Sequence, residues 1–535
     1  MVLTYHFNFK KMIMKIQWII LLAFSVLITG CDNDQYFELD RPVQAPWQSL
    51  SDFEKAPIGA YYGLSGIDGL QTIFAAGRIA GEVYADGANL APQEEGFSTG
   101  GDVEDMYDRI TGMQLSLFDN AVFNSAYFAI GNANGGLDFI EENNGNPFPE
   151  ANRPDEIDRI KGELLFVRAY AYYWLAKVYA PAYPDDEERL PFRLSQANNL
   201  EEAKTSDLAS STDLHEQIVK DLREAQELLP EQYEEGVHPP SYADGRATKF
   251  AAAALLGKVL FQMGEHQAAL EPLNLVIEES NGILDLSEDP IEAFNKQGVK
   301  RGSEVIWYYA LWAGDGLGGP SNWKHPRRFE WYNGINRYSL DPANNGGRFI
   351  RASDSFLEQV GWQANGKVTG EAMEDKRFSQ LFLRFTPSES GEVVADNIYP
   401  EPNGNFATTR DYVWNNRYYR AGDRSTNLPI LRLADMYLLR AIIRAQSGDT
   451  DGAISDLNAV RNRAGLGDYS GEMDLEEAIH QERFKEMAFE GDRLYYLQGL
   501  RMDIPAGDRD GSAVPWDAPL YSEIPDYETN VNDAY

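Results

Sequence analysis

Apolar side chains recur along this chain with the period of an α-helix. Residues 49–64 and 212–229 each place them on one helical face, and residues 162–180 place them around nearly the whole circumference. We therefore predict three helices, of which 162–180 is buried between others. The boundary signals are Pro181 and Pro230 after the second and third helices, and Ser211 or Thr212 as the N-cap of the third.

A helical hairpin occurs twice in the sequence. In residues 252–263 the apolar positions fall at i, i+3, i+4, i+7, i+8 and i+11, Gly264 follows, and a second apolar helix covers 269–277. The pattern returns with Leu439, Gly448, Ala453, Leu457 and Val460 in the places of Leu255, Gly264, Ala269, Leu273 and Val276. Such repeats are typical of tetratricopeptide-like units, which bury their apolar faces by stacking. The sequence therefore predicts a mainly α fold built from tetratricopeptide-like hairpins.

Residues 281–428 differ in character from the rest of the chain. They are rich in Gly, Pro, Asn, Trp and Tyr, and only Ser353–Val360 shows a short helical pattern. Residues 305–311 are typical of a strand, so we expect about half of Trp307, Tyr308 and Tyr309 to be buried by alternation. We predict a long, irregular, partly β insertion, the kind of segment in which binding residues are often found.

The N-terminus has the pattern of an export signal. Three lysines within residues 10–15 precede an apolar run from Ile16 to Ile28, which is too short for a spanning helix. The run ends in Ile28-Thr29-Gly30-Cys31, which resembles the lipobox of bacterial lipoproteins, and Cys31 is the one cysteine of the chain. We expect lipidation at Cys31. The predicted parts are a signal peptide at 1–30, an acidic tether at 31–48, a helical part at 49–280, the insertion at 281–428 and a C-terminal helical part at 429–535.

Composition and net charge exclude some classes of protein and of ligand. Hydrophobic residues make up 43% of the chain and aromatic residues 12%, which excludes wholesale disorder. Lys and Arg total 47 against 84 Asp and Glu, a formal charge of -37. Nucleic acid is therefore excluded as a partner of the whole chain, and a neutral ligand is favoured over a polyanion.

Aromatic residues are dense between 307 and 338. Flat rings cover the apolar faces of sugar rings, while neighbouring amide and guanidinium groups bond the hydroxyls. Core packing of the insertion is the competing explanation, above all for the strand residues. The candidate ligand contacts among Gly, Pro and Asn are Trp312, Trp323, Trp331 and Tyr332, with Asn322 and Arg328 as polar partners.

Other motifs are better explained by structure than by catalysis. Glu482, Glu486 and Glu490 are spaced as on one helical face, and with Arg483 and Arg493 nearby we favour an ion network over a glycosidase acid pair. The six histidines include no His-x-x-x-His pair, so zinc is not expected. Gly314–Gly319 lacks the helix that a nucleotide loop needs, and Asp449–Gly452 suits a turn. We expect no cofactor, with surface calcium left open for so acidic a chain.

Several motifs together resemble the SusD/RagB family of outer-membrane lipoproteins of Bacteroidota. The resemblance rests on the lipobox, the early helix around Phe53 to Tyr61, the Gly162-Glu163 to Tyr173 helix with Arg168-Ala169, the hairpin at 247–279, Leu428–Asp435, Leu457–Leu466 and, most specifically, the block Glu482 to Arg493. One departure is Tyr495-Tyr496-Leu497, where the family usually has an Asp-Leu pair.

The resemblance implies a non-catalytic, surface-exposed protein that is anchored by lipid in the outer membrane. Such proteins bind a polysaccharide or oligosaccharide and close over a SusC-like TonB-dependent transporter; RagB-like members deliver peptides instead. The family often uses an acidic residue of an early loop on sugar, which points to Asp86 and neighbouring Tyr84, although Asp86-Gly87 is also an ordinary turn. Glycan capture, peptide delivery and a glycosidase stay as three alternatives.

Overall fold

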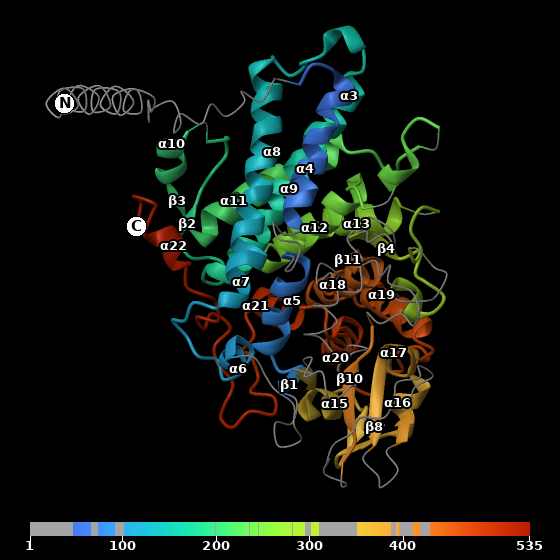
Figure 1. Cartoon of the computed structure of the whole chain (residues 1–535). Coiled ribbons are helices and arrows are strands. Elements are labelled where there is room, and N and C mark those ends of the chain that lie inside the picture. The colour runs from blue at the N-terminus through green and yellow to red at the C-terminus, as the bar shows by residue number, and fades with distance from the viewer. Residues whose placement is uncertain are drawn as a thin grey trace, which may run out of the picture. The chain divides into compact units, whose positions relative to one another are not determined.

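The computed structural model describes residues 47–65, 73–90, 101–197, 199–234, 236–243, 245–280, 282–294, 301–309, 350–386, 392–394, 410–417 and 428–535 (Figure 1). The chain divides into two compact units, Met1–Phe53 and Glu54–Tyr535. In the first unit the structure describes 47–53, where helix α3 (Leu50–Phe53) places Phe53 edge-on to Trp47 with 4.9 Å between ring centroids. The predicted signal peptide and lipidated Cys31 lie outside the described residues.

The long helix predicted at 162–180 is confirmed and begins earlier. Helix α9 (Pro154–Tyr179) starts with a proline in its first turn and is buried along almost its entire length. It packs against α4 (Lys55–Leu64), α8 (Ser125–Glu142) and α11 (Ser211–Leu228), which explains why its apolar residues occupy every face.

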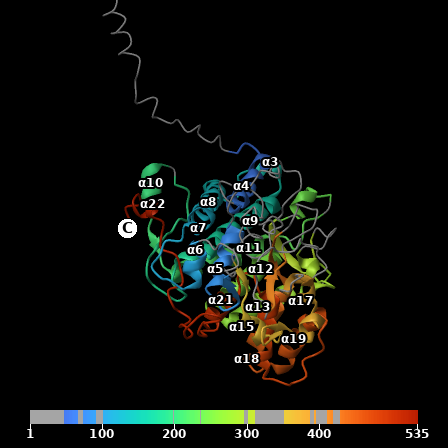
Figure 2. The same ribbon diagram turned by 60° about the horizontal axis from the view of Figure 1, so that its bottom comes forward.

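Both predicted helical hairpins are confirmed. The first is α12 (Lys249–Gln262) with α13 (His266–Glu278), and the second is α18 (Leu433–Gln446) with α19 (Thr450–Arg463). The turns contain Gly264 at φ +81° and Gly448 at φ +85°, left-handed conformations that favour glycine. Helix α13 contacts α18, and Figure 2 shows the two hairpins side by side, so they stack as the repeat predicted.

The N-cap of α11 lies one residue before Ser211 and two before Thr212, the two predicted N-caps. The N-cap is Ser210, whose hydroxyl accepts from the backbone N–H of Asp213 at 3.1 Å while the Asp213 carboxylate accepts from the N–H of Ser210 at 2.9 Å. This reciprocal capping box decides between neighbouring serines and threonines, because only Ser210 has an acidic residue three positions later.

The partly β character of residues 281–428 is confirmed in its described part. Strand β4 (Val305–Tyr309) pairs antiparallel with β11 (Leu428–Arg432), and β10 (Tyr412–Asn415) pairs with β8 (Phe382–Thr386), which pairs with β9 (Glu392–Val394). The predicted helix near Ser353–Val360 is α15 (Asp354–Gln359), capped by Ser353. Two short helices, α16 (Gly370–Glu374) and α17 (Lys376–Leu381), and a hairpin of β6 (Gln363–Ala364) and β7 (Lys367–Val368) were not predicted.

The remaining elements complete the second unit. Helix α5 (Ile73–Val83) contacts α21 (Arg493–Gly499), and Figures 1 and 2 both show them adjacent although they come from opposite ends of the chain. Strand β1 (Ala88–Leu90) pairs with β5 (Ile350–Ala352). The others are α6 (Gly101–Tyr107), α7 (Ser116–Phe118), a π-helix (Asp119–Asn124), β2 (Leu190–Pro191), α10 (Leu200–Lys204), β3 (Leu208–Ala209), α20 (Leu475–Met487) and α22 (Asp526–Thr529).

Within the described ranges, every helix falls short of the combined length and apolar character needed to cross a membrane.

Candidate functional site

Two pairs of antiparallel strands hold the ends of the aromatic segment predicted to bind ligand. At one end Tyr309 of β4 lies opposite Leu428 of β11, and at the other Ile350 of β5 lies opposite Leu90 of β1. The described residues on either side of segment 310–349 therefore lie in ladders made with distant parts of the chain. The predicted ligand residues within it are Trp312, Asn322, Trp323, Arg328, Trp331 and Tyr332; they lie outside the described residues, and their role stays a prediction.

The aromatic residues of β4 belong to the core. Val305, Ile306, Trp307 and Tyr308 are all buried and Tyr309 is half-buried, so the expectation that alternate residues would be exposed is wrong. The reason is that both faces of the strand are covered. The Trp307 ring meets Phe166 and Tyr170 of α9 at 4.8 and 4.9 Å between centroids, and Arg301 covers the Tyr308 ring at 5.8 Å.

Helix α5 packs against the last residue of β4, Tyr309. The Phe74 ring stacks on the Tyr309 ring with 4.7 Å between centroids and 26° between planes. The indole N–H of Trp307 donates to the carbonyl of Gly245 at 2.8 Å. Tyr309, the last described residue before segment 310–349, is thus held by stacking as well as by the strand ladder.

Asp86 and Tyr84 follow α5 and are both buried, 1% and 2% exposed. The Asp86 carboxylate accepts two hydrogen bonds from the Arg493 guanidinium, at 2.8 Å from Nε and 3.0 Å from Nη2. The backbone carbonyl of Tyr84 accepts from Arg109 Nε at 2.9 Å. Since neither side chain presents surface to a ligand here, the sugar contact predicted for Asp86 and Tyr84 gains no support from this geometry.

One turn earlier, Glu82 ties α5 to the closing block of the sequence. Its Oε1 accepts from the backbone N–H of Gly491 at 2.7 Å, and its Oε2 has no hydrogen-bond partner in the described part of the chain. Burial raises the pKa of Glu82 to about 7, and the nearby Asp492 charge adds to the rise. The close approach of α5 to Gly491 requires a glycine at position 81, because a Cβ on Gly81 would come within 2.3 Å of the Gly491 carbonyl oxygen.

The carboxylates of the closing block form a buried ion network. Glu486 contacts Arg432 at 2.8 Å and Arg463 at 2.6 Å, and Arg432 Nη1 also contacts Glu304 at 2.6 Å. The other contacts are Glu482 with Arg377 at 2.7 Å and Arg461 at 3.4 Å, and Glu490 with Arg417 at 2.8 Å. The predicted network is confirmed, and it joins α20 to α17, α19 and the β4–β11 ladder.

The predicted cations of this network were wrong. Arg483 pairs instead with Asp435 at 2.7 Å and with Asp492 at 2.7 Å, and Arg493 pairs with Asp86. Helix α20 ends at Met487, so Glu490 lies beyond the helix rather than on its face. Sequence neighbours on a helix point in different directions, and the true partners come from segments far along the chain.

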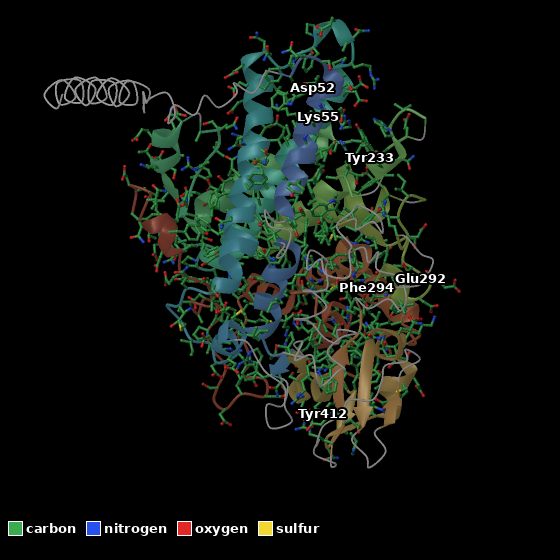
Figure 3. All side chains as sticks on the ribbon, in the orientation of Figure 1. Asp52, Lys55, Tyr233, Glu292, Phe294 and Tyr412 are labelled. Carbon is green, nitrogen blue, oxygen red and sulfur yellow. The ribbon has the colours of Figure 1, made fainter. Side chains whose placement is uncertain are left out.

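Electrostatics in the network oppose acid catalysis. Burial by itself would raise the pKa of Glu486, but the guanidiniums of Arg463, Arg432 and Arg377 outweigh it and hold that pKa below its ordinary value. A glycosidase acid must instead carry a proton near neutral pH. The ring of Phe294, which Figure 3 labels, has its centroid 4.9 Å from the Arg432 guanidinium and 5.2 Å from that of Arg417.

The described residues contain no group of three or more His, Cys, Asp or Glu side chains arranged to hold a metal ion.

Two family models match the chain. One, described as starch-binding and associating with the outer membrane, matches residues 98–261, and the other, the SusD family, matches residues 304–498. Together they cover more than half of the sequence. A curated relative, SusD-like protein P25 of Formosa agariphila, is 26% identical over 92% of this chain and 91% of its own length.

The fold of this chain resembles those of solved structures over nearly its whole length. A SusD superfamily protein of Bacteroides thetaiotaomicron has a TM-score of 0.69 at 20% identity, covering 91% of this chain and 98% of its own. Surface glycan-binding protein A of Bacteroides uniformis has a TM-score of 0.66 at 17% identity, again over 91% and 98%. At these identities the likeness establishes the fold.

Proposed function

The chain belongs to the SusD/RagB family, and from that premise we propose that it is a non-catalytic glycan-binding lipoprotein of the cell surface. It captures a polysaccharide or oligosaccharide and delivers it to a SusC-like TonB-dependent transporter. The observation that carries the proposal is that both residues flanking the aromatic-rich segment 310–349 lie in strand ladders: Tyr309 pairs with Leu428, and Ile350 pairs with Leu90.

Glycan capture in this proposal uses stacking and hydrogen bonding. Trp312, Trp323, Trp331 and Tyr332 cover the apolar faces of sugar rings, and Asn322 with Arg328 and other polar groups of the segment bond the hydroxyls. The residues that flank this segment, Tyr309 and Ile350, are each paired in a strand ladder. The formal charge of -37 favours a neutral glycan, since a polyanion would be repelled.

Attachment to the outer membrane is assigned to the lipid on Cys31, followed by the acidic stretch that contains Asp32, Asp34 and Glu38. No cofactor takes part in the proposed function. Binding without turnover is supported by Glu486, whose pKa the surrounding guanidinium groups hold below its ordinary value. Glu482 and Glu490 are likewise ion-paired with arginines.

Peptide delivery is the alternative function within the same family. It predicts selective retention of peptides and no retention of glycans. The experiment that separates the two uses the chain from Asp32 onward, which contains every described residue, in native gels that hold neutral and anionic polysaccharides, with reducing ends assayed on the same samples. Retardation by a glycan without new reducing ends supports the proposal. Retardation by none favours peptide delivery, and new reducing ends would establish an enzyme.

A further inference from the structure

A pocket lies in the C-terminal half of the described chain. It encloses about 470 Å³ between the segment 358–375, which runs from the end of α15 to the end of α16, and the segment 461–485, which covers the α19–α20 loop and most of α20. Pockets of roughly 300 to 1,000 Å³ are typical of small-ligand sites in proteins. The volume suits one or two sugar rings.

The floor of this pocket is rigid. Glu482 lines it and is held by Arg377, which also donates from Nε to Asp375 at 2.9 Å. Trp362 lines it as well, is 2% exposed, and packs edge-on against Phe356 and Phe378 with 5.7 and 5.2 Å between centroids. A ligand would therefore meet a preformed surface, which limits the cost of ordering on binding.

Two hydrogen-bond donors at the pocket have no acceptor among the residues that the structure describes. One is the indole N–H of buried Trp362, and the other is the ammonium of half-buried Lys485. Burial lowers the pKa of Lys485, while the charge of Glu482 opposes that fall. Neither donor nitrogen is among the fully buried polar atoms that lack a partner, so water can reach both at the pocket. An acceptor supplied by a ligand can replace that water at both positions.

Acceptors gather on the rim of the same pocket. Glu358, Glu371, Glu374 and Glu472 are exposed there, and their carboxylates contact no cation in the described ranges. The Tyr469 ring also lines the pocket, in a loop that is held by the hydrogen bond from its backbone N–H to Asn458 Oδ1 at 2.7 Å and from its hydroxyl to the Met473 carbonyl at 2.5 Å. An ordered ring of this kind can cover the apolar face of a sugar.

The mixture of unpartnered donors and acceptors favours a ligand that both donates and accepts. A polyanion would be repelled by the rim. A peptide also carries carbonyl acceptors that Trp362 and Lys485 could meet, so the choice of a sugar follows from the proposed function. A sugar hydroxyl is donor and acceptor at once, so one neutral sugar can satisfy both sets. We propose that this pocket is a second binding site for a neutral sugar unit, built from residues 358–375 and 461–485. The inference rests on the proposed function, since it adds a site for the same class of ligand.

The test locates binding along the chain. Maltoheptaose, cellohexaose and xylohexaose serve as neutral probes, and hydrogen–deuterium exchange of the chain from Asp32 onward is measured with and without saturating probe. We expect slower exchange in peptides that cover 357–363 and 464–474. The variants Lys485→Met and Glu371→Gln/Glu374→Gln should remove that protection and weaken binding at this pocket roughly ten-fold or more, the loss of one charged hydrogen bond. The matched control is Glu476→Gln, an exposed carboxylate on the same helix outside the pocket.

The outcomes separate this inference from the proposed function. Protection confined to 310–349, or protection at 464–474 that survives both variants, would overturn the second site and leave glycan capture standing. Absence of protection together with no retardation on any polysaccharide would overturn both.

Discussion

Asp86 and Arg493 lie 407 positions apart in the sequence and form a bidentate pair in the core, with 2.8 Å from Oδ1 to Nε and 3.0 Å from Oδ2 to Nη2. The Arg493 guanidinium also lies 3.9 Å from the centroid of the Phe484 ring. The early loop after α5 and the closing block of the sequence thus meet in one buried contact, and that contact is structural.

Replacing Asp86 should therefore cost stability. Asp86→Ala leaves the Arg493 charge buried without its partner, which typically costs about 3 to 5 kcal/mol in the free energy of unfolding. Denaturant unfolding of the variant, with exposed Asp510→Ala as the control, measures the loss. A variant that unfolds like the wild type but binds glycan more weakly would contradict a structural role and restore Asp86 as a ligand contact.

The Glu486 carboxylate should behave as a structural anion and not as a catalyst. Glu486→Gln removes the charge that faces Arg432 and Arg463, and we expect a loss of about 3 to 5 kcal/mol in the free energy of unfolding. Release of reducing ends from polysaccharides should be absent in wild type and variant alike. Glu476→Gln, on the exposed side of α20, is the matched control. Hydrolysis by the wild type that disappears in the variant would overturn the assignment.

The stability contributed by Glu82 should depend on pH. Its pKa rises from 4.5 to about 7 in the folded protein, so between these values the folded state keeps a proton that the unfolded state has lost. The wild type therefore loses stability as pH rises from about 4.5 through 7, by at most roughly 3 kcal/mol.

Glu82→Gln removes this titration and keeps an oxygen to accept from the Gly491 N–H. Relative to wild type, the variant should gain stability between pH 5 and pH 8. Thermal unfolding of both proteins at the two pH values measures the difference, with exposed Glu472→Gln as the control. A difference that does not change with pH would contradict the raised pKa.

Cys31 should govern where the protein is found. Cys31→Ser leaves the apolar run of the signal intact but removes the thiol that would receive lipid. We expect the wild type to partition into the detergent phase and the variant into the aqueous phase, as measured by detergent phase separation and blotting of cell fractions. Partition of the variant into detergent would show an anchor other than this lipid.

Local sequence patterns predicted the helical part of this molecule well. The hairpin α12–α13 and its repeat α18–α19 could be found because apolar spacing and the turn residues Gly264 and Gly448 lie within one short window. Helix α9 could be identified as buried for the same reason.

Contacts between distant segments could not be predicted in this way. Arg432 is 54 positions from Glu486, and Arg377 is 109 positions away, so nothing local identified them as partners. The sequence pointed instead to Arg483, which lies on the same helix but faces Asp435 and Asp492. Burial of β4 on both faces likewise depends on α9 and Arg301, which the strand's own alternation does not show.

The most direct test of glycan capture by segment 310–349 is titration calorimetry with the glycan that retards the protein in gels. Wild type is compared with Trp312→Ala, Trp323→Ala and Trp331→Ala. We predict that at least one variant binds about ten-fold more weakly or worse, because an aromatic contact with a ligand ring contributes roughly 1 to 3 kcal/mol, while its thermal unfolding matches the wild type. Unchanged affinity in all three variants would contradict the account.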